Sequence, residues 1–97
     1  MNGRDYMGLV AQMPCAICGR WPVEVHHRRT GVGAGRRASD FETIPLCPEH
    51  HRGNAGLHGM GRCAWERAHG ITELELLART ALAVEARSRQ LRLTTEG

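Results

Sequence analysis

The sequence predicts a small α+β domain that is braced by a bound metal, and three observations favour this fold class. The chain has 97 residues, enough for one hydrophobic core, and only 4% of them are aromatic. A core this thin usually needs a metal or a disulfide for stability. Short β-rich segments and amphipathic helical segments share the chain with two closely spaced Cys/His pairs. We therefore expect a single domain over residues 1–97.

The N-terminal half predicts one helix followed by two short strands. Residues 3–12 have an apolar side and end just before a proline, which favours a helix. Residues 21–26 alternate and are rich in β-formers, so we expect a strand there. The glycine-rich loop, residues 31–37, contains too many glycines for regular structure. Residues 41–46 predict the second strand.

The C-terminal half predicts short helices and one longer helix. Pro48 is typical of a first helical turn, and the glycines that follow interrupt or bend that helix. Residues 64–68 predict a short helix that Gly70 ends. Residues 72–75 form a capping box, and the helix that they begin is expected to run over residues 72–89. Its apolar stripe is predicted to consist of Leu74, Leu77, Ala78, Ala81 and Leu82.

The basic residues are unevenly distributed. All thirteen are arginines, the net charge is +3, and the segment 20–37 carries five arginines against the single acid Glu24. A local basic patch indicates an anionic partner, of which nucleic acid is the commonest, although a solvated basic loop has the same composition.

Targeting signals are absent from the sequence as given. It has no run of about 18 apolar residues, and its N-terminus lacks the features of a signal peptide. We therefore expect a cytoplasmic protein with no membrane partner. In a reducing compartment, four cysteines hold a metal more often than they form disulfides.

Two ligand pairs predict a structural Zn²⁺ site. Cys15 and Cys18 form one Cys-x2-Cys pair, and Cys47 and His50 form a second pair with the same spacing. The adjacent His51 could replace His50 as the fourth ligand. Cys63 has no partner at ligand spacing and is interpreted as a free thiol.

Histidines exceed what one zinc site can use. The chain has six, and His26 and His27 are neighbours at the end of the first predicted strand. Because adjacent strand residues point to opposite faces, one of the two can bind a second metal while the other faces a substrate.

The order of these motifs resembles the HNH (ββα-metal) endonuclease family, and more narrowly the RecA-dependent recombination-enhancement nucleases of phage. The resemblance covers residues 14–70: Cys-x2-Cys, Val-His-His, a basic glycine-rich loop, Ile-Pro-Leu-Cys-x2-His-His and Leu-His-Gly-Met-Gly. It implies a fold of two short strands and a helix around one catalytic metal, with a zinc knuckle and flanking helices.

The resemblance also implies roles for individual residues. His26 and His51 match ligands of the catalytic metal, and His27 matches the general base. The middle residue of the motif, usually Asn, has no Asn counterpart here. Asp40 is our first choice for the group that orients the base, and Glu42 is the second.

His58 is expected to be the third ligand of the catalytic metal. On an unbroken helix it would lie about 10.5 Å beyond His51, which is too far for one ion. Glycines 53 and 56 could fold the chain back, and otherwise Asn54 is nearer to the metal and His58 would face the phosphate.

The expected function is a metal-dependent DNA endonuclease, and the resemblance implies a RecA-type recombinase filament as its partner. The catalytic ion would be Mg²⁺, Mn²⁺, Ni²⁺ or Zn²⁺. The DNA contacts would come from Arg28, Arg29, Arg36 and Arg37. The alternative is a non-catalytic zinc module that binds DNA or a protein. Such a module would have no use for four histidines beyond the zinc site.

Overall fold

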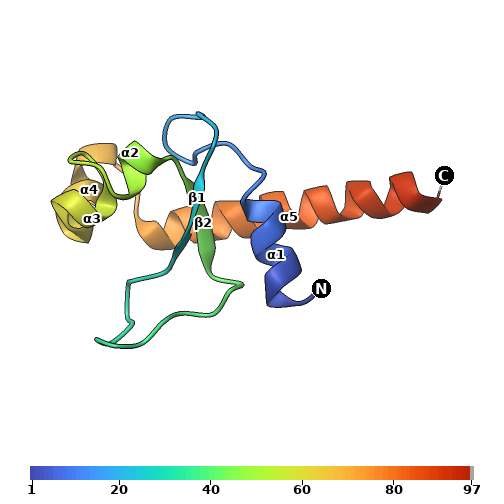
Figure 1. Ribbon diagram of the computed structural model, residues 1–97, viewed down its shortest axis with the longest axis horizontal. Helices are drawn as coiled ribbons and strands as arrows, with labels where there is room; N and C mark the ends of the chain where they lie inside the picture. Colours follow the sequence, from blue (N-terminus) through green and yellow to red (C-terminus); the bar gives the residue numbers. More distant parts are fainter. Residues whose placement is uncertain (97) are drawn as a thin grey trace.

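The structure is a computed structural model that describes the backbone of residues 1–96 and the side chains of residues 1–93. Within this part of the chain, helices and strands follow one another as drawn in Figure 1: α1 (Gly3–Val10), β1 (Glu24–His27), β2 (Thr43–Leu46), α2 (Pro48–His51), α3 (Leu57–Met60), α4 (Arg62–His69) and α5 (Glu73–Glu96). The small α+β fold with a two-stranded sheet is therefore confirmed.

Strands β1 and β2 form an antiparallel pair in which His26 lies opposite Ile44 and His27 opposite Thr43. All four residues of β2 are buried, because α1 and α5 pack against this strand. Both strands begin two or three residues later than expected. Pro22 has no N–H to contribute to a sheet, and Phe41 is turned outward against Tyr6, with ring centroids 5.3 Å apart.

The connection between the strands has no helix or strand, as the glycines predict. In Figure 1 this connection projects from the end of the sheet at which β1 finishes and β2 begins. The connection begins directly after the two histidines of β1, so its first residues lie close to them.

Helix α5 runs along the sheet and continues past α1 (Figure 1). Its capping box is confirmed, because Thr72 N donates to Glu75 and Glu75 N donates to the Thr72 hydroxyl. The predicted end near residue 89 is wrong. The helix continues to Glu96 because no glycine or proline interrupts it there. In the described part of the chain, no helix is long and apolar enough to span a membrane.

The predicted apolar stripe of α5 is wrong except at Leu77, which is partly buried against the main core. Leu74 is 52% exposed and Leu82 is 68% exposed. The buried face instead carries Glu73, Leu76, Thr80 and Val84. Compared with the predicted orientation, α5 is rotated about its own axis. Hydrogen bonds with His26 and Thr30 hold the Glu73 carboxylate inside the molecule. From Leu76 onward, the buried positions recur every four residues.

The glycines after α2 permit a very tight fold-back. A Cβ on Gly59 would lie 2.3 Å from the Gly53 carbonyl oxygen, and one on Gly56 would lie 2.7 Å from the Glu49 carbonyl oxygen. Only glycine allows backbones to approach this closely. Helix α3 therefore returns over α2, and His58 comes back toward His51.

The core has two parts. The larger one surrounds the fully buried Trp65 and includes Ile44, Leu46, Leu57, Leu76 and the cysteines 15 and 47. The smaller one joins Tyr6, Val10 and Val84 beneath α1. Two of the predicted zinc ligands thus belong to the main core, so the metal site and the packing of the core are parts of one structure.

Candidate functional site

The predicted structural zinc ligands lie together. The ligand atoms of Cys15, Cys18, Cys47 and His50 are all within 4.8 Å of one another. Cys18 Sγ lies 3.7 Å from Cys47 Sγ, and His50 Nδ1 lies 3.3 Å from Cys47 Sγ. Two sulfurs bound at about 2.3 Å to a tetrahedral zinc would be about 3.8 Å apart. The four residues fit a zinc ion and could hold one.

The electrostatics of these thiols suit a cation. Burial opposes ionisation of Cys15, but backbone N–H groups around its sulfur outweigh this effect and lower the pKa of Cys15 to about 7. Desolvation and the neighbouring thiols raise the pKa of Cys18. A zinc ion would relieve the crowding of thiolates, because its charge stabilises their deprotonated form.

Helix α2 separates the two adjacent histidines that were alternatives for the fourth zinc ligand. His50 faces the cysteines, whereas His51 faces His26 of β1. Consecutive residues point about 100° apart around a helix, which allows this division. Cys63 is exposed on α4 and is not part of either metal-ligand cluster of the described residues.

A second cluster brings His26, His51 and His58 together. Their ligand atoms also lie within 4.8 Å of one another. His51 Nε2 is 3.2 Å from His26 Nδ1 and 3.1 Å from His58 Nε2. Two nitrogens that bind one ion at about 2.0–2.1 Å are separated by about 3.0–3.4 Å. The spacing of the three imidazoles therefore fits a shared divalent ion.

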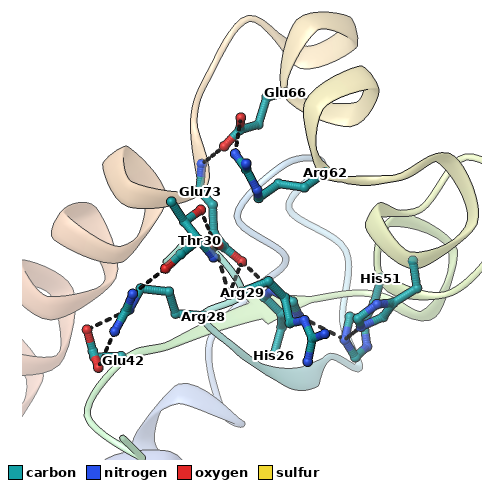
Figure 2. Close-up of polar contacts among 10 residues, drawn as sticks. His26, Arg28, Arg29, Thr30, Glu42, His51, Arg62, Glu66 and Glu73 are labelled. Carbon is teal, nitrogen blue, oxygen red and sulfur yellow. Dashed lines mark hydrogen bonds and ion pairs between the residues drawn. The ribbon is translucent and has the colours of Figure 1, made fainter. Parts of the chain in front are cut away.

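Two carboxylates lie behind this cluster. Glu73 Oε2 is 2.6 Å from His26 Nε2, and Glu24 Oε1 is 2.8 Å from His51 Nδ1. Each contact uses the ring nitrogen that faces away from the cluster. Because a carboxylate can only accept, a proton on that nitrogen would leave the inner nitrogen with its lone pair. Figure 2 shows His26 between Glu73 and His51. This arrangement is typical of histidines that ligate metals.

The same contacts set the ionisation of both carboxyl groups. Burial would raise the pKa of Glu73, but hydrogen bonds from His26 and Thr30 outweigh it and lower the pKa to about 2. The hydrogen bond with His51, together with Arg52, lowers the pKa of Glu24. Burial and the nearby His51 lower the pKa of His58, which favours its neutral, ligating form.

Neither carboxylate was predicted as part of the site. Glu24 precedes His26 by two residues, and the period of two along a strand could have placed them on one face. Glu73 lies 47 residues from His26 and was interpreted only as part of a capping box. No local signal connects those two residues.

His27 faces away from the cluster, toward the strand connection. Its Nε2 lies 2.9 Å from Asp40 Oδ1, and Arg37 Nη2 donates to the same oxygen at 2.9 Å. Hydrogen bonds from His27 and then Arg37 lower the pKa of Asp40. The structure therefore brings the first-choice orienting residue to His27. The second choice, Glu42, pairs with Arg28 instead.

The four predicted DNA-contacting arginines have different surroundings. Arg28 is held by Glu42, with Nε 2.8 Å from the carboxylate, and by the Thr30 carbonyl. Arg37 is held by Asp40. Within residues 1–93, no ion pair involves the guanidinium of Arg29 or Arg36. A groove along the connection is lined by Arg28, Gly31, Gly33, Arg36, Arg37 and Ser39.

The comparisons with known proteins place the chain in a family. Residues 1–85 match the family model described as "Protein of unknown function (DUF968)". The chain belongs to the DUF968 family. No curated protein and no solved structure matches it significantly. The DUF968 match spans both metal-ligand clusters, the glycine-rich loop and the start of α5, so all the residues of the candidate site lie within the family's own region.

Proposed function

We propose that this chain is a metal-dependent endonuclease of the HNH type that hydrolyses phosphodiester bonds of DNA. The observation that carries the proposal is the pair of neighbours on β1. His26 belongs to a three-histidine cluster, whereas His27 turns away and contacts Asp40. A ligand cluster beside an imidazole backed by a carboxylate has the groups that metal-assisted hydrolysis needs.

The histidine cluster would hold the catalytic ion. A divalent cation bound by His26, His51 and His58 would supply positive charge to the phosphate and to the leaving oxygen. Three protein ligands leave coordination positions free, and His58 lies at the exposed side of the cluster. Imidazole ligands favour Mn²⁺, Ni²⁺ or Zn²⁺ over Mg²⁺, which prefers oxygen ligands.

His27 would act as the general base. His27 Nε2 lies 2.9 Å from Asp40 Oδ1 and 3.2 Å from Arg37 Nε. We assign the ring proton to Nε2, because the shorter contact is with a carboxylate, which can only accept, and Arg37 also pairs with that carboxylate through Nη2. Nδ1 then keeps a lone pair that can take a proton from water. Asp40 orients the ring and stabilises the positive charge that His27 gains, as the carboxylate of a catalytic triad does.

The arginines of the strand connection would bind the DNA backbone. The guanidinium groups of Arg29 and Arg36 are without an acidic partner among the described residues, so they are the first candidates for phosphate contacts. Arg37 lies beside His27 and Asp40, where it could approach a phosphate near the base. Arg28 braces the loop through Glu42.

A nicking assay tests this proposal. Purified protein is incubated with supercoiled plasmid in Mg²⁺, Mn²⁺, Ni²⁺ or Zn²⁺, with and without a RecA-type recombinase filament, which the resemblance names as a partner. We expect nicking that requires a divalent ion and is about 10²–10⁴-fold slower in His27→Ala. DNA binding without cleavage under every condition would favour the alternative, a non-catalytic zinc module that binds DNA or a protein.

A further inference from the structure

Glu73, the first residue of α5, has a fully buried side chain between the end of β1 and the glycine-rich loop. A buried carboxylate is costly unless its oxygens receive several hydrogen bonds. Figure 2 shows Glu73 at the centre of a network that extends from His51 on one side to Glu42 on the other.

The two carboxylate oxygens serve different parts of the molecule. Oε2 faces His26 Nε2 at 2.6 Å. Oε1 accepts from Thr30 N at 2.8 Å and from the Thr30 hydroxyl at 2.6 Å, and Arg29 N lies 3.0 Å from both oxygens. One group therefore contacts a histidine of the metal-ligand cluster and also the residues that lead into the glycine-rich loop.

Glu73 is itself held in place. Its backbone N–H donates to Glu66 Oε2 at 2.6 Å, and Glu66 Oε1 accepts from Arg62 Nη1 at 2.9 Å. Leu76, one turn further along α5, is buried in the core. Supports on both sides leave the carboxylate little freedom to leave His26.

We propose that Glu73 is a positioning residue for the histidine cluster: it holds the proton of His26 on Nε2, so that Nδ1 is kept for the metal, and it ties that ring to the start of the loop. The inference rests on the metal-binding cluster of the proposed function, but not on DNA cleavage. Because one carboxylate serves both, metal binding at His26 and ordering of the loop are coupled.

Replacement of Glu73 by Gln separates this role from simple anchoring of the loop. The amide oxygen of Gln can still accept from Thr30, but its NH₂ group would then face His26 Nε2. Since that NH₂ group can only donate, the ring proton must move to Nδ1, the nitrogen that faces the cluster. The shape of the side chain is preserved while the ligand nitrogen is lost.

Glu42→Gln is the matched control. Glu42 supports the same strand connection through Arg28, and none of its contacts among the described residues involves a histidine. Both variants would be purified with zinc kept in the cysteine site. Co²⁺ would then be titrated into the histidine cluster and followed by its visible d–d absorption, without DNA. Long-range ¹⁵N–¹H spectra would report the tautomer of His26 before cobalt is added.

We expect the Nε2–H tautomer of His26 in the wild-type protein and the Nδ1–H tautomer in E73Q. Cobalt affinity should fall about 10–100-fold in E73Q and change less than about twofold in E42Q. Equal affinities in E73Q and wild type would overturn the proposal, as would equal losses in both variants. Should E73Q not fold, the wild-type spectrum decides alone: an Nδ1–H tautomer would overturn the proposal, and an Nε2–H tautomer would support it. A protein that binds cobalt as expected but cuts no DNA would contradict the nuclease proposal only.

Discussion

The cysteine site and the histidine site use the same helix but differ in how they are built. The cysteine site takes its ligands from the turn that holds Cys15 and Cys18 and from the start of α2, and two of its thiols lie in the main core. The histidine site takes its ligands from β1, α2 and α3, and each of two ligands is backed by a carboxylate. Four protein ligands close a zinc site, whereas three leave room for water or substrate.

This difference indicates a division of labour. Closed sites with soft thiolate ligands contribute mainly to folding, and open imidazole sites with ordered carboxylate partners are typical of catalysis. His50 and His51, neighbours on α2, join the two sites through a single turn of helix. The predictions that follow test whether stability depends on one site and chemistry on the other.

The largest effect is expected from removal of the cysteine-site metal. Chelation, or the substitution Cys47→Ser, should abolish cooperative unfolding, because a metal bound at this site would supply much of the free energy of folding in a core this small. Circular dichroism and thermal melting with and without chelator would measure it. A stripped protein with an unchanged spectrum and melting temperature would contradict a structural role.

Loss of the imidazole of His27 should affect chemistry alone. His27→Ala is expected to reduce the cleavage rate by about 10²–10⁴, with zinc content, melting and DNA affinity near wild type. His26→Ala should instead lose the ion of the histidine site together with activity, because its Nδ1 faces that cluster. Metal content by mass spectrometry, together with the nicking rate, distinguishes the two. Wild-type cleavage by the His27 variant would show that its role has been misassigned.

A single methyl group should disturb the histidine site from a distance. In Gly59→Ala, the new Cβ would meet the Gly53 carbonyl at 2.3 Å, so α3 must move away from the turn that follows α2 and take His58 with it. We expect weaker cobalt binding and a destabilisation of about 1–3 kcal/mol, measured by titration and by urea unfolding. Gly8→Ala is the control, since no atom lies within 4 Å of the added Cβ. Equal cobalt affinity in both variants would argue against the fold-back as the determinant of the site.

The smallest effect is expected from the exposed arginines of the strand connection. Arg36→Ala should weaken DNA binding about equally for unrelated sequences. It should also reduce the slope of log affinity against log salt concentration by about one. Arg87→Ala, an exposed arginine on α5, should leave both unchanged. Fluorescence anisotropy over a range of salt concentrations measures the two slopes. A sequence-selective loss in the Arg36 variant would indicate contacts with bases instead of phosphates.

The parts of the fold that short segments determine were predictable. Ligand spacing in Cys15–Cys18 and Cys47–His50 identified the cysteine cluster, because a turn of two intervening residues brings both ligands to one ion. Alternation along β1 separated His26 from His27. The capping box before α5 and the glycine at the end of α4 also occur where the local pattern indicates.

Interactions between distant segments were not predictable from these patterns. His69, the last residue of α4, packs edge-on against Trp65 and against His50, with ring centroids 5.1 Å and 5.3 Å away. The prediction placed Leu74 and Leu82 on the buried face of α5, and both are exposed. The spacing of apolar residues alone cannot show that the Glu73 side chain is buried through its contact with His26.

The sequence by itself determined which residue types could hold metals and how far apart along the chain they lie. Only the tertiary structure decided which histidine joins which site, that Glu24 and Glu73 stand behind the ligands, and that Arg28 and Arg37 are held by acids. The physical reason is separation: a spacing of two or three residues fixes geometry through the local backbone, whereas the 47 residues between His26 and Glu73 fix it only through packing of the whole chain.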